Sequence, residues 1–554
     1  MPSRRITPIH FPLGGVNRRF AVQNQAQAGG YTTPLALNVW PDAQGRERGG
    51  SRPGIGRSFV GPEGLGMNAS PITMINGVTF IPGAEGAGDG IATTLVASTA
   101  TPTGTEPNLF WCDPSLSSTF AAVDGNPIFS PNQLLQSAEH LERLYIADHD
   151  DTEQGSTLSF FPKIFDPETD LVTTWSDEVT AGDLPLGCPL ICLWRDRILL
   201  GGGAITPNDV MGSKQGDPLN WDFSDTLTSG AFALSATSAG AIGDRLTCMS
   251  THADNCVMLG CSDSMWLMMG DPKFGGQVKN LSNRVGVLDR NAFCVSPDGL
   301  FLFLSRDGLY ACAAGCKSLE APERVSREKL PQELLNIDVS IEDSGNAVSM
   351  VYDLYHGGIY IFVTPRDPGS DGAVHWFYHW GTKSFWPFQF ASPSFDPWCV
   401  HSRKNFEGSE KVLLGCADGF VRSFDTTKQL DGDQGEDWFG EDAAGFQSYV
   451  VFGPFSDSAL YSELMLAELA VVLSQASSPV FWEVFTGNTA EEGAAAAEAG
   501  TRPAARGQLG AGRSFNSHPR VRGQSLYLKL RCAGGGWAFE GMTAGFAKLG
   551  KVRM

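Results

Sequence analysis

The sequence predicts a mainly β protein, and three features of its composition and pattern carry that prediction. Glycine (65 residues), proline (33) and phenylalanine (34) are abundant among the 554 residues, a mix typical of short strands joined by tight turns. Charged residues make up only 18%. Short apolar runs separated by turn residues recur from about residue 70 onward, which favours antiparallel hairpins over long helices.

The length predicts more than one domain, because single hydrophobic cores stop growing at about 250–300 residues. We expect an extended N-terminal arm and anchor over residues 1–58, which are poor in apolar side chains. A β-propeller-like body is expected over 59–430. A C-terminal β-sandwich-like domain is expected over 431–554, where the Ala/Glu-rich stretch 489–500 is either a loop or a short helix.

The propeller prediction depends on three segments with one shared scheme, at 255–268, 298–310 and 411–424. Each has a short apolar run, a turn containing Asp followed by Gly or Ser, and a second apolar run, which is the pattern of a hairpin. Six or seven such units at intervals of about 40–60 residues indicate propeller blades. Stacked sandwiches are the alternative. The segment 191–201 is expected to be one strand.

The net charge of −21 is unevenly distributed. Residues 1–57 hold eight arginines, no lysine and two carboxylates, which gives +6 and leaves −27 for the remaining chain. A strongly acidic body argues against a surface that grips nucleic acid. The arginine-rich arm itself has few aromatic residues to stack on bases, so a nucleic-acid-binding arm is a weaker hypothesis.

The twelve cysteines are scattered along the chain, and residues 1–10 are charged and polar rather than apolar. We therefore expect small buried hydrophobic residues in a protein made in a reducing cytoplasm, not a disulfide framework. No run of about 18 apolar residues occurs, so no transmembrane segment is predicted.

Three groups of residues have metal-ligand chemistry, and in each a structural role is the favoured interpretation. Two histidines lie four apart within an aromatic strand, with a cysteine and a histidine further on (His375, His379, Cys399, His401). Two cysteine pairs with three intervening residues could share a zinc ion, but one runs into an expected buried strand and the other lies at a strand end (Cys188 and Cys192, Cys312 and Cys316). An acidic turn lacks the EF-hand spacing for calcium (Asp431, Asp433, Glu436, Asp437). The prediction is that no metal or other cofactor is bound.

No catalytic motif stands out. The chain has no G-x-S-x-G sequence, the S-x-x-K match at 326–329 is a chance spacing, and the Gly-rich stretch 83–90 lacks the Lys of a phosphate loop. Paired carboxylates for glycoside hydrolysis stay possible among 61 acidic residues. We expect a protein that is not an enzyme, with no catalytic residues.

A series of short motifs runs along the chain in a fixed order. They are Gly-Gly-Val-Asn at 14–17, Asn-Val-Trp-Pro-Asp at 38–42, Arg-Pro-Gly at 52–54, Trp-Arg-Asp-Arg at 194–197, Pro-Asn-Asp-Val at 207–210, Gly-Asp-Pro-Leu-Asn-Trp at 216–221 and Asn-Arg-Val-Gly at 283–286. In order and spacing this series resembles the tail nozzle proteins (tail tubular protein B family) of short-tailed bacteriophages, over about residues 14–310. The sequence departs from that family in the 489–500 stretch and the long acidic loop.

The resemblance implies a structural virion protein of the phage tail tube or nozzle, assembled in the host cytoplasm. Such proteins form a homo-oligomeric ring, usually of six copies, below the portal and adaptor proteins. The ring adjoins tail fibres and continues the channel through which viral DNA passes without sequence-specific binding. Assembly contacts are expected at the motifs of the arm, namely Asn17, Arg18, Arg19, Asn38, Trp40, Arg52, Pro53 and Gly54.

Two further expectations follow. If the arm only connects subunits, a chain lacking residues 1–58 should fold as a monomer that no longer enters tails. The alternative function is a virion-associated propeller hydrolase or polysaccharide depolymerase, and such an enzyme would be distinguished by acidic residues clustered on the turns at one channel mouth.

Overall fold

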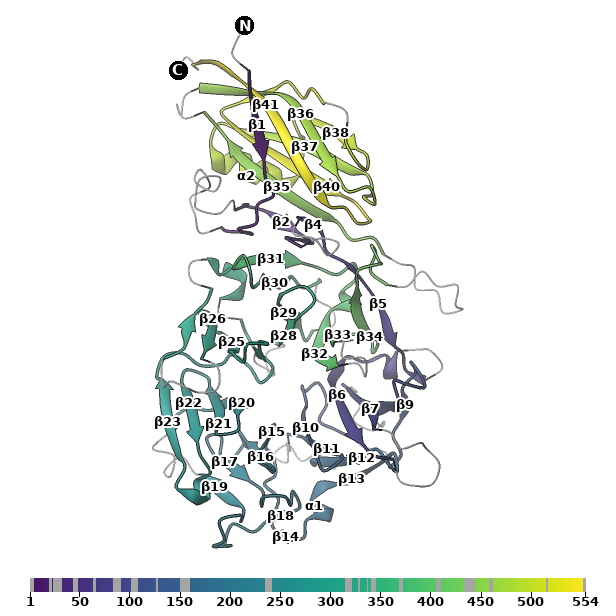
Figure 1. The fold of residues 1–554 in the computed structure, drawn as a ribbon, viewed down its shortest axis with the longest axis vertical. Helices are drawn as coiled ribbons and strands as arrows, with labels where there is room; N and C mark the ends of the chain where they lie inside the picture. Colours follow the sequence, from purple (N-terminus) through teal and green to yellow (C-terminus); the bar gives the residue numbers. More distant parts are fainter. Residues whose placement is uncertain are drawn as a thin grey trace.

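The computed structural model contains a β-propeller and a β-sandwich, so the prediction of a mainly β protein with a propeller-like central domain is confirmed (Figure 1). Residues 4–551 are described, apart from the segments 19–21, 23–31, 43–47, 63–65, 83–90, 101–107, 126–127, 150–159, 235–241, 314–320, 327–328, 336, 340–344, 368–371, 405–409, 433–443, 458–461 and 515–516.

In the described residues, seven four-stranded antiparallel sheets surround a common centre, each built from strands that follow one another closely in the sequence except in the last sheet. Such an arrangement is a seven-bladed propeller. Blades one to four contain β6 (Ile72–Phe80), β7 (Ala92–Thr99), β8 (Leu109–Cys112), β9 (Ala121–Ala122); β10 (Gln136–His140), β11 (Arg143–Ala147), β12 (Lys163–Asp166), β13 (Leu171–Thr174); β15 (Leu190–Trp194), β16 (Arg197–Gly201), β17 (Val210–Gly212), β19 (Phe232–Leu234); and β20 (Leu246–Ala253), β21 (Cys256–Cys261), β22 (Met265–Met269), β23 (Gln277–Ser282). Blades five to seven contain β24 (Phe293–Val295), β25 (Phe301–Ser305), β26 (Gly308–Cys312), β27 (Glu323–Arg324); β28 (Asn346–Asp353), β29 (Gly358–Pro365), β30 (His375–His379), β31 (Ser384–Phe388); and β32 (Pro397–Lys404), β33 (Glu410–Cys416), β34 (Val421–Asp425), β5 (Gly54–Phe59).

The three segments with the shared scheme all form hairpins, as predicted: β21 with β22, β25 with β26, and β33 with β34. In the second, Ser305 pairs with Gly308 across a two-residue turn. All five residues of β25 are buried, because each face of a blade packs against a neighbouring blade. This explains why the strands are continuous apolar runs and do not alternate.

We expected the segment 191–201 to be one strand, but it forms most of the hairpin β15–β16. Arg195 and Asp196 form its turn, with φ angles of 47° and 61°. Two central residues with positive φ are the geometry of a type I′ turn, which the twist of a two-residue hairpin requires. Neither residue is the Gly or Asn that normally marks such a turn, so the residue types at these two positions do not predict it.

The ring is closed by the N-terminal segment. β5 pairs antiparallel with β34, so that Ile55 lies opposite Phe424 and Gly54 opposite Asp425. The outermost strand of the seventh blade therefore comes from a part of the chain more than 330 residues away from the other three. Without β5, the edge of β34 would lose its partner.

This closure contradicts the expectation that a chain lacking residues 1–58 folds as a monomer. Besides β5, the N-terminal segment supplies β1 (Arg4–Ile9), which pairs with β41, and β2 (Ala36–Leu37), which pairs with β35. The segment is therefore not a free arm in the described residues, because its strands complete sheets in both domains.

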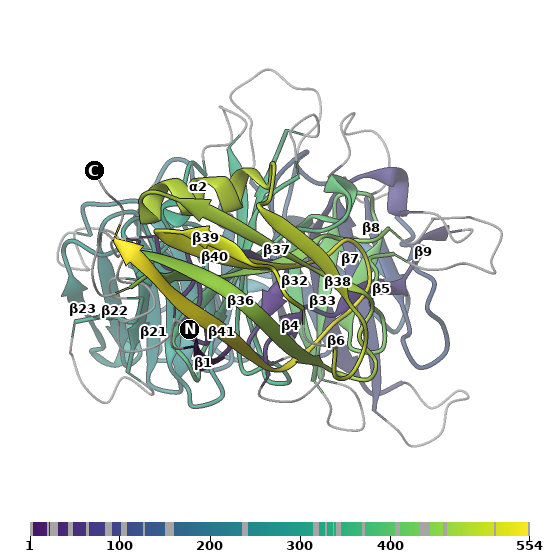
Figure 2. The same cartoon turned by 90° about the horizontal axis from the view of Figure 1, so that it is seen from above.

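The C-terminal region forms two packed sheets, with strand orders β1-β41-β36-β39 and β2-β35-β40-β37-β38. Its strands are β35 (Ser448–Phe455), β36 (Ser462–Leu473), β37 (Val480–Gly487), β38 (Ala505–Leu509), β39 (Val521–Gly523), β40 (Ser525–Cys532) and β41 (Phe539–Lys551). Buried apolar side chains from both sheets share one core, for example Leu466 and Leu528, which is the packing of a β-sandwich. Seen from above, α2 covers the outer side of the β37–β40 sheet (Figure 2).

The Ala/Glu-rich stretch is a helix, which settles the choice between loop and helix. α2 (Ala490–Ala499) begins after Thr489, whose hydroxyl accepts a hydrogen bond from the Glu492 N–H at 3.1 Å. It ends at Gly500, which has a φ of 63°. Ser/Thr at the N-cap and a left-handed glycine at the C-cap are standard helix boundaries. Gly493 lets the helix approach the ring of Tyr527 closely.

The remaining elements are short connections. They are β3 (Val39–Trp40), β4 (Gly50–Ser51), β14 (Ala181–Gly182), β18 (Asn220–Trp221), α1 (Trp175–Glu178) and 3-10 turns at Met67–Ala69, Pro272–Phe274, Gln332–Leu334 and Pro393–Phe395. In the described part of the chain, no helix is long and apolar enough to cross a membrane.

Candidate functional site

The junction between the propeller and the sandwich is where the motifs of the N-terminal segment meet. One apolar core runs through it without interruption, from Phe388 and Leu414 of the propeller, through Trp40 and Ile55, to Leu528 of the sandwich. All five of these side chains are buried. Because N-terminal residues fill the space between the two domains, the junction is a continuous interior and not a surface contact.

Three motifs that are separate in the sequence line up along β31, the outer strand of blade six. The N–H of Val16 donates to the Phe385 carbonyl oxygen at 3.0 Å, and the N–H of Asn38 donates to the Pro387 carbonyl oxygen at 3.0 Å. The guanidinium of Arg52 donates to the carbonyl oxygen of Gln389, just past the strand, at 2.8 Å. The motifs at 14–17, 38–42 and 52–54 thus all form hydrogen bonds along the outer edge of blade six.

Arg52 is the centre of the junction, with its side chain fully buried against Asp431. Two parallel hydrogen bonds of 2.8 and 2.5 Å join the guanidinium to the carboxylate. The other three N–H groups donate to Asn38 Oδ1 and to the carbonyl oxygens of Pro53 and Gln389. All five donors are satisfied, and the guanidinium also stacks on the Phe446 ring at 3.8 Å. A buried bidentate pair of this kind fixes the position of the Arg52 segment relative to the Asp431 segment.

Asn38 connects both domains through its side chain. Its amide nitrogen donates to the Gln447 carbonyl oxygen, next to β35 of the sandwich, at 2.8 Å. Its amide oxygen accepts from Arg52 Nε at 3.0 Å and from the N–H of Gln389, beside the propeller, at 2.9 Å. The backbone has a φ of 55°, in the left-handed region that Asn tolerates better than most residues.

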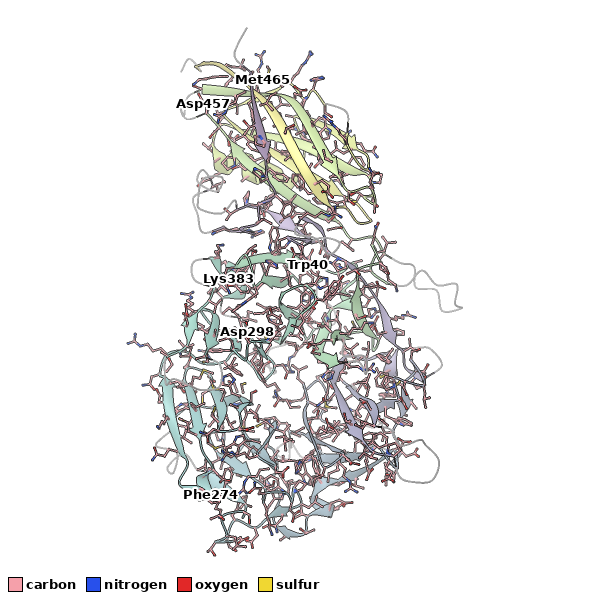
Figure 3. All side chains as sticks on the ribbon, in the orientation of Figure 1. Trp40, Phe274, Asp298, Lys383, Asp457 and Met465 are labelled. Carbon is pink, nitrogen blue, oxygen red and sulfur yellow. The ribbon has the colours of Figure 1, made fainter. Side chains whose placement is uncertain are left out.

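Trp40 lies between the two domains (Figure 3). Its ring contacts an aromatic cluster of blades six and seven: His356, Tyr360, Phe377, Phe388 and Phe424, with centroid distances of 4.8 to 6.1 Å. Its side chain is completely buried. Aromatic burial of this extent is a main source of packing energy.

The structure gives most of the expected assembly residues an intramolecular role. Asn17, Asn38, Trp40 and Arg52 are buried within the chain, so they are not available to touch another subunit. Pro53 is half-buried, and Gly54 begins β5. Arg18 is half-exposed and pairs with Glu333 at 2.7 Å. Arg19 lies outside the described residues.

Gly54→Ala should destabilise the protein, because a methyl group at this position would overlap the backbone carbonyl oxygen of Leu430. The backbone of one segment would have to move, and overpacking of this kind costs about 1–3 kcal/mol. The measurement is the urea dependence of unfolding. Gly510→Ala is the matched control, since nothing lies within 4 Å of its added methyl group; an equal loss in both variants would contradict the packing argument.

The two histidines of β30 have protein partners on both ring nitrogens. His375 Nε2 lies 3.0 Å from Asp396 Oδ1, and its Nδ1 accepts from the Val363 N–H at 3.2 Å. His379 Nε2 lies 3.1 Å from Asp42 Oδ2. The strand buries both on one face, four residues apart, as the period of a strand requires. They serve as hydrogen-bonding core residues.

The hydrogen bonds around His379 resemble those of a catalytic triad. In that comparison Thr382 would be the nucleophile, His379 the base and Asp42 the acid that orients it. Thr382 Oγ1 lies 2.8 Å from His379 Nδ1, and Asp42 binds the other ring nitrogen. The same Nδ1 accepts from the backbone N–H of Thr382 at 3.2 Å, and the hydroxyl is also 2.6 Å from Ser384 Oγ. These contacts hold the turn between β30 and β31. The spacing in the sequence did not reveal this set, because Asp42 is 337 residues away.

The other proposed metal ligands do not come together in the described residues. Cys188 and Cys192 are free thiols, and burial raises the pKa of each to about 12, which opposes the thiolate that zinc requires. Cys312 is also free, whereas Cys316 lies outside the described residues. Among the residues described, no three His, Cys, Asp or Glu side chains form a group that could hold a metal ion.

Asp431 is not a solvated turn residue or a calcium ligand. Its two carboxylate oxygens bind Arg52, and Oδ2 also accepts from the Ala391 N–H at 2.9 Å. The expectation of a solvated acidic turn is wrong at this position, because the charge partner is 379 residues earlier in the chain. Asp433, Glu436 and Asp437 lie outside the described residues.

A cavity of 410 Å³ lies where the inner strands of several blades meet, lined by residues of β6, β10, β15, β20, β24 and β32. Gln136 of blade two donates to the Arg290 carbonyl oxygen near blade five at 3.0 Å, and its amide oxygen accepts from the Ile191 N–H of blade three at 3.3 Å. Asn76 of blade one donates to Ser137 Oγ of blade two at 2.8 Å. These amides link the inner strands of the blades across the centre of the ring.

His401 lines the same cavity and makes the stability of the fold depend on pH. Burial, assisted by the positive charge of Arg403, lowers its pKa from 6.5 to about 4. Between those values the unfolded chain binds a proton that the folded chain does not, so stability falls as pH drops from about 6.5 toward 4. We expect His401→Gln to reduce this decline in melting temperature. His518→Gln, at an exposed position, is the control, and an unchanged pH profile in His401→Gln would contradict the assignment.

Comparisons with known proteins add little beyond this geometry. No protein-family model and no curated protein matches the chain. Among solved structures, a chain of the mitotic checkpoint complex is 11% identical and matches 59% of this chain and 86% of its own length, with a TM-score of 0.34. The WD40 β-propeller domain of Doa1 is 10% identical, with coverages of 67% and 97% and a TM-score of 0.30. The extracellular domain of a two-component system from B. thetaiotaomicron is 11% identical, with coverages of 73% and 58% and a TM-score of 0.32. All three TM-scores are low, so the propeller description rests on the strand pairings above.

Proposed function

We propose that the chain is a structural subunit of a phage tail, forming a homo-oligomeric ring of six copies in the tail tube or nozzle. The observation that carries the proposal is the convergence of three motifs. The sequences at 14–17, 38–42 and 52–54, which carry the resemblance to tail nozzle proteins, meet along β31 at the junction. A shared structural task explains why they occur together and in order.

The joined domains suit a protein that must keep its shape under mechanical force. The shared apolar core and the buried Arg52–Asp431 pair oppose relative motion of propeller and sandwich. A ring of such subunits would keep its diameter while DNA passes. The net charge of −21 would repel the DNA backbone and prevent the counterion-release binding that would hold it in the channel.

In this proposal the ring contacts the portal and adaptor proteins above it and the tail fibres beside it, inside the virion. Arg18 is the one described residue among the expected assembly contacts whose charged group is substantially exposed. It is therefore the first position to examine at a subunit interface.

The test is the mass of the purified full chain, alone and mixed with the adaptor complex, by sedimentation velocity. The proposal expects a species of six times the 59.4 kDa chain mass, at least when the adaptor is present. A chain that remains monomeric in the presence of adaptor at micromolar concentration would overturn it.

A second candidate, a virion-associated hydrolase, is favoured by one observation, the Thr382–His379–Asp42 arrangement. Such a set activates a hydroxyl for acyl transfer. Ester hydrolysis by the purified protein that is lost in Thr382→Val and kept in Thr427→Val would support it. Activity equal to buffer would exclude acyl transfer by this set.

A further inference from the structure

The C-terminal half of the sandwich carries a charge opposite to that of the propeller. From residue 499 to residue 539 the sequence has seven arginines and lysines and no aspartate or glutamate. In residues 59–430, by contrast, acidic residues outnumber basic ones by 45 to 22. Charge of one sign that is gathered on one part of a chain indicates a partner of the opposite sign.

Five arginines of this stretch lie along one side of the sandwich, which we call the arginine edge: Arg502, Arg506, Arg513, Arg520 and Arg522. β38 is the outermost strand of one sheet and β39 of the other, and both lie beside β37. The described part of the connection between them follows β36, because Ser517 pairs with Leu469 and residue 513 with residue 472. The five arginines therefore belong to one side of the molecule.

The arginine edge is exposed and its charge is not compensated. All five side chains are exposed, and in the described part of the chain none of their guanidinium groups forms an ion pair or a hydrogen bond. The carboxylates of the neighbouring strands have other partners. Glu483, which lies opposite Arg506, binds Arg531 at 3.2 Å, Glu540 binds Arg48, and Glu468 is also engaged.

The composition of the edge favours a nucleic acid over a protein as the partner. Among the described residues of 499–539, no large hydrophobic side chain is exposed. Protein interfaces are centred on apolar and aromatic side chains, whereas a phosphate backbone offers charge and no apolar surface. Small and polar residues lie between the arginines, and a methyl group added at Gly510 would meet nothing within 4 Å. The edge is therefore open to a ligand that lies along it.

Charged side chains also protect sheet edges from pairing with other chains. That role needs charges on the edge strands themselves. Arg502, Arg513 and Arg520 lie outside β38 and β39, so edge protection does not account for them. It also does not require a stretch without any carboxylate, since either sign of charge protects an edge.

We propose that the arginine edge binds the phosphate backbone of a nucleic-acid duplex without regard to base sequence. Guanidinium groups form bidentate, charge-assisted hydrogen bonds with phosphate oxygens. A row of them displaces counterions from the duplex, which gives an affinity that depends on salt. The inference is independent of the proposed ring, because all five arginines belong to one chain. The repulsion of DNA expected of an acidic protein then applies to the propeller alone.

Fluorescence anisotropy of a labelled short DNA duplex, titrated with the full chain at several salt concentrations, tests the proposal. We expect saturable binding that is equal for two duplexes of unrelated sequence. A plot of the logarithm of the association constant against that of the salt concentration should have a slope of about −4, close to −0.9 for each arginine. Absence of saturable binding would overturn the proposal. So would poly-glutamate that competes as well as unlabelled duplex of equal charge, because it would identify an acidic protein as the partner.

The variant Arg513→Gln/Arg520→Gln/Arg522→Gln locates the site. The three positions are exposed, so the fold should be kept. We expect binding at low salt to weaken by about ten-fold or more, and the magnitude of the slope to fall by about 3. Lysine at the same three positions should keep the slope, because the positive charges remain.

The matched control is Arg245→Gln/Arg284→Gln/Arg306→Gln, which changes three exposed positions of the propeller. It alters the net charge of the protein by the same amount, and it should bind the duplex as the unchanged protein does. Equal weakening in the two triple variants would show that net charge, and not the arginine edge, determines binding, and would contradict the proposal.

Discussion

A chain that begins at residue 59 is expected to fail to fold. It lacks β5, so the seventh blade loses its outer strand, and it lacks β1 and β2, so both sheets of the sandwich lose a strand. It also lacks Trp40 and Ile55 from the core that joins the domains. Near-ultraviolet circular dichroism and size-exclusion chromatography would show an aggregated chain without fixed aromatic packing.

The truncated chain can also be tested by adding back the missing segment. A synthetic peptide of residues 1–58, added during refolding, should restore some of the native signal, because the missing strands pair through their backbones. A truncated chain that unfolds cooperatively, with the near-ultraviolet spectrum of the full chain, would contradict the view that the N-terminal segment is part of both domains.

Arg52→Ala is expected to destabilise the protein by about 3–5 kcal/mol, because it leaves the carboxylate of Asp431 buried without its charge partner. The loss should be seen as a lower urea midpoint. Asp431→Ala should have a similar effect, since the buried guanidinium then loses its counter-charge and two of its five hydrogen bonds. Arg18→Ala, which breaks a half-exposed pair with Glu333, is the control and should change stability by less than about 1 kcal/mol.

The double variant Arg52→Met/Asp431→Leu separates charge from packing. Replacing both partners of a buried pair with apolar side chains is often neutral, so it should be more stable than either single alanine variant. If Arg52→Ala changes the midpoint no more than Arg18→Ala does, the pair does not hold the junction.

The local part of the fold could be predicted from the sequence, and the long-range part could not. The hairpin of β25 and β26 was visible because Asp307 and Gly308 interrupt an apolar run, and turn chemistry is read over a few residues. The turn at Arg195 and Asp196 has the aspartate but no glycine after it. Its positive φ angles are imposed by the pairing of Trp194 with Arg197.

The N-terminal segment was misjudged because its partners are hundreds of residues away. It has few apolar residues, but Ile9, Trp40 and Ile55 are all buried, and the pairing of Arg52 with Asp431 spans 379 positions. Judged only from its neighbours in the sequence, a carboxylate such as Asp431 in an acidic, turn-rich run is predicted to be exposed to solvent.

The most direct test of the proposed function is electron microscopy of phage particles that contain this chain, at a resolution that traces the strands. The account predicts six copies around the tail axis, each with the propeller and sandwich joined as in Figure 1, enclosing a continuous channel. A density in which the chain is absent from the tail, or present as a single copy off the axis, would contradict it.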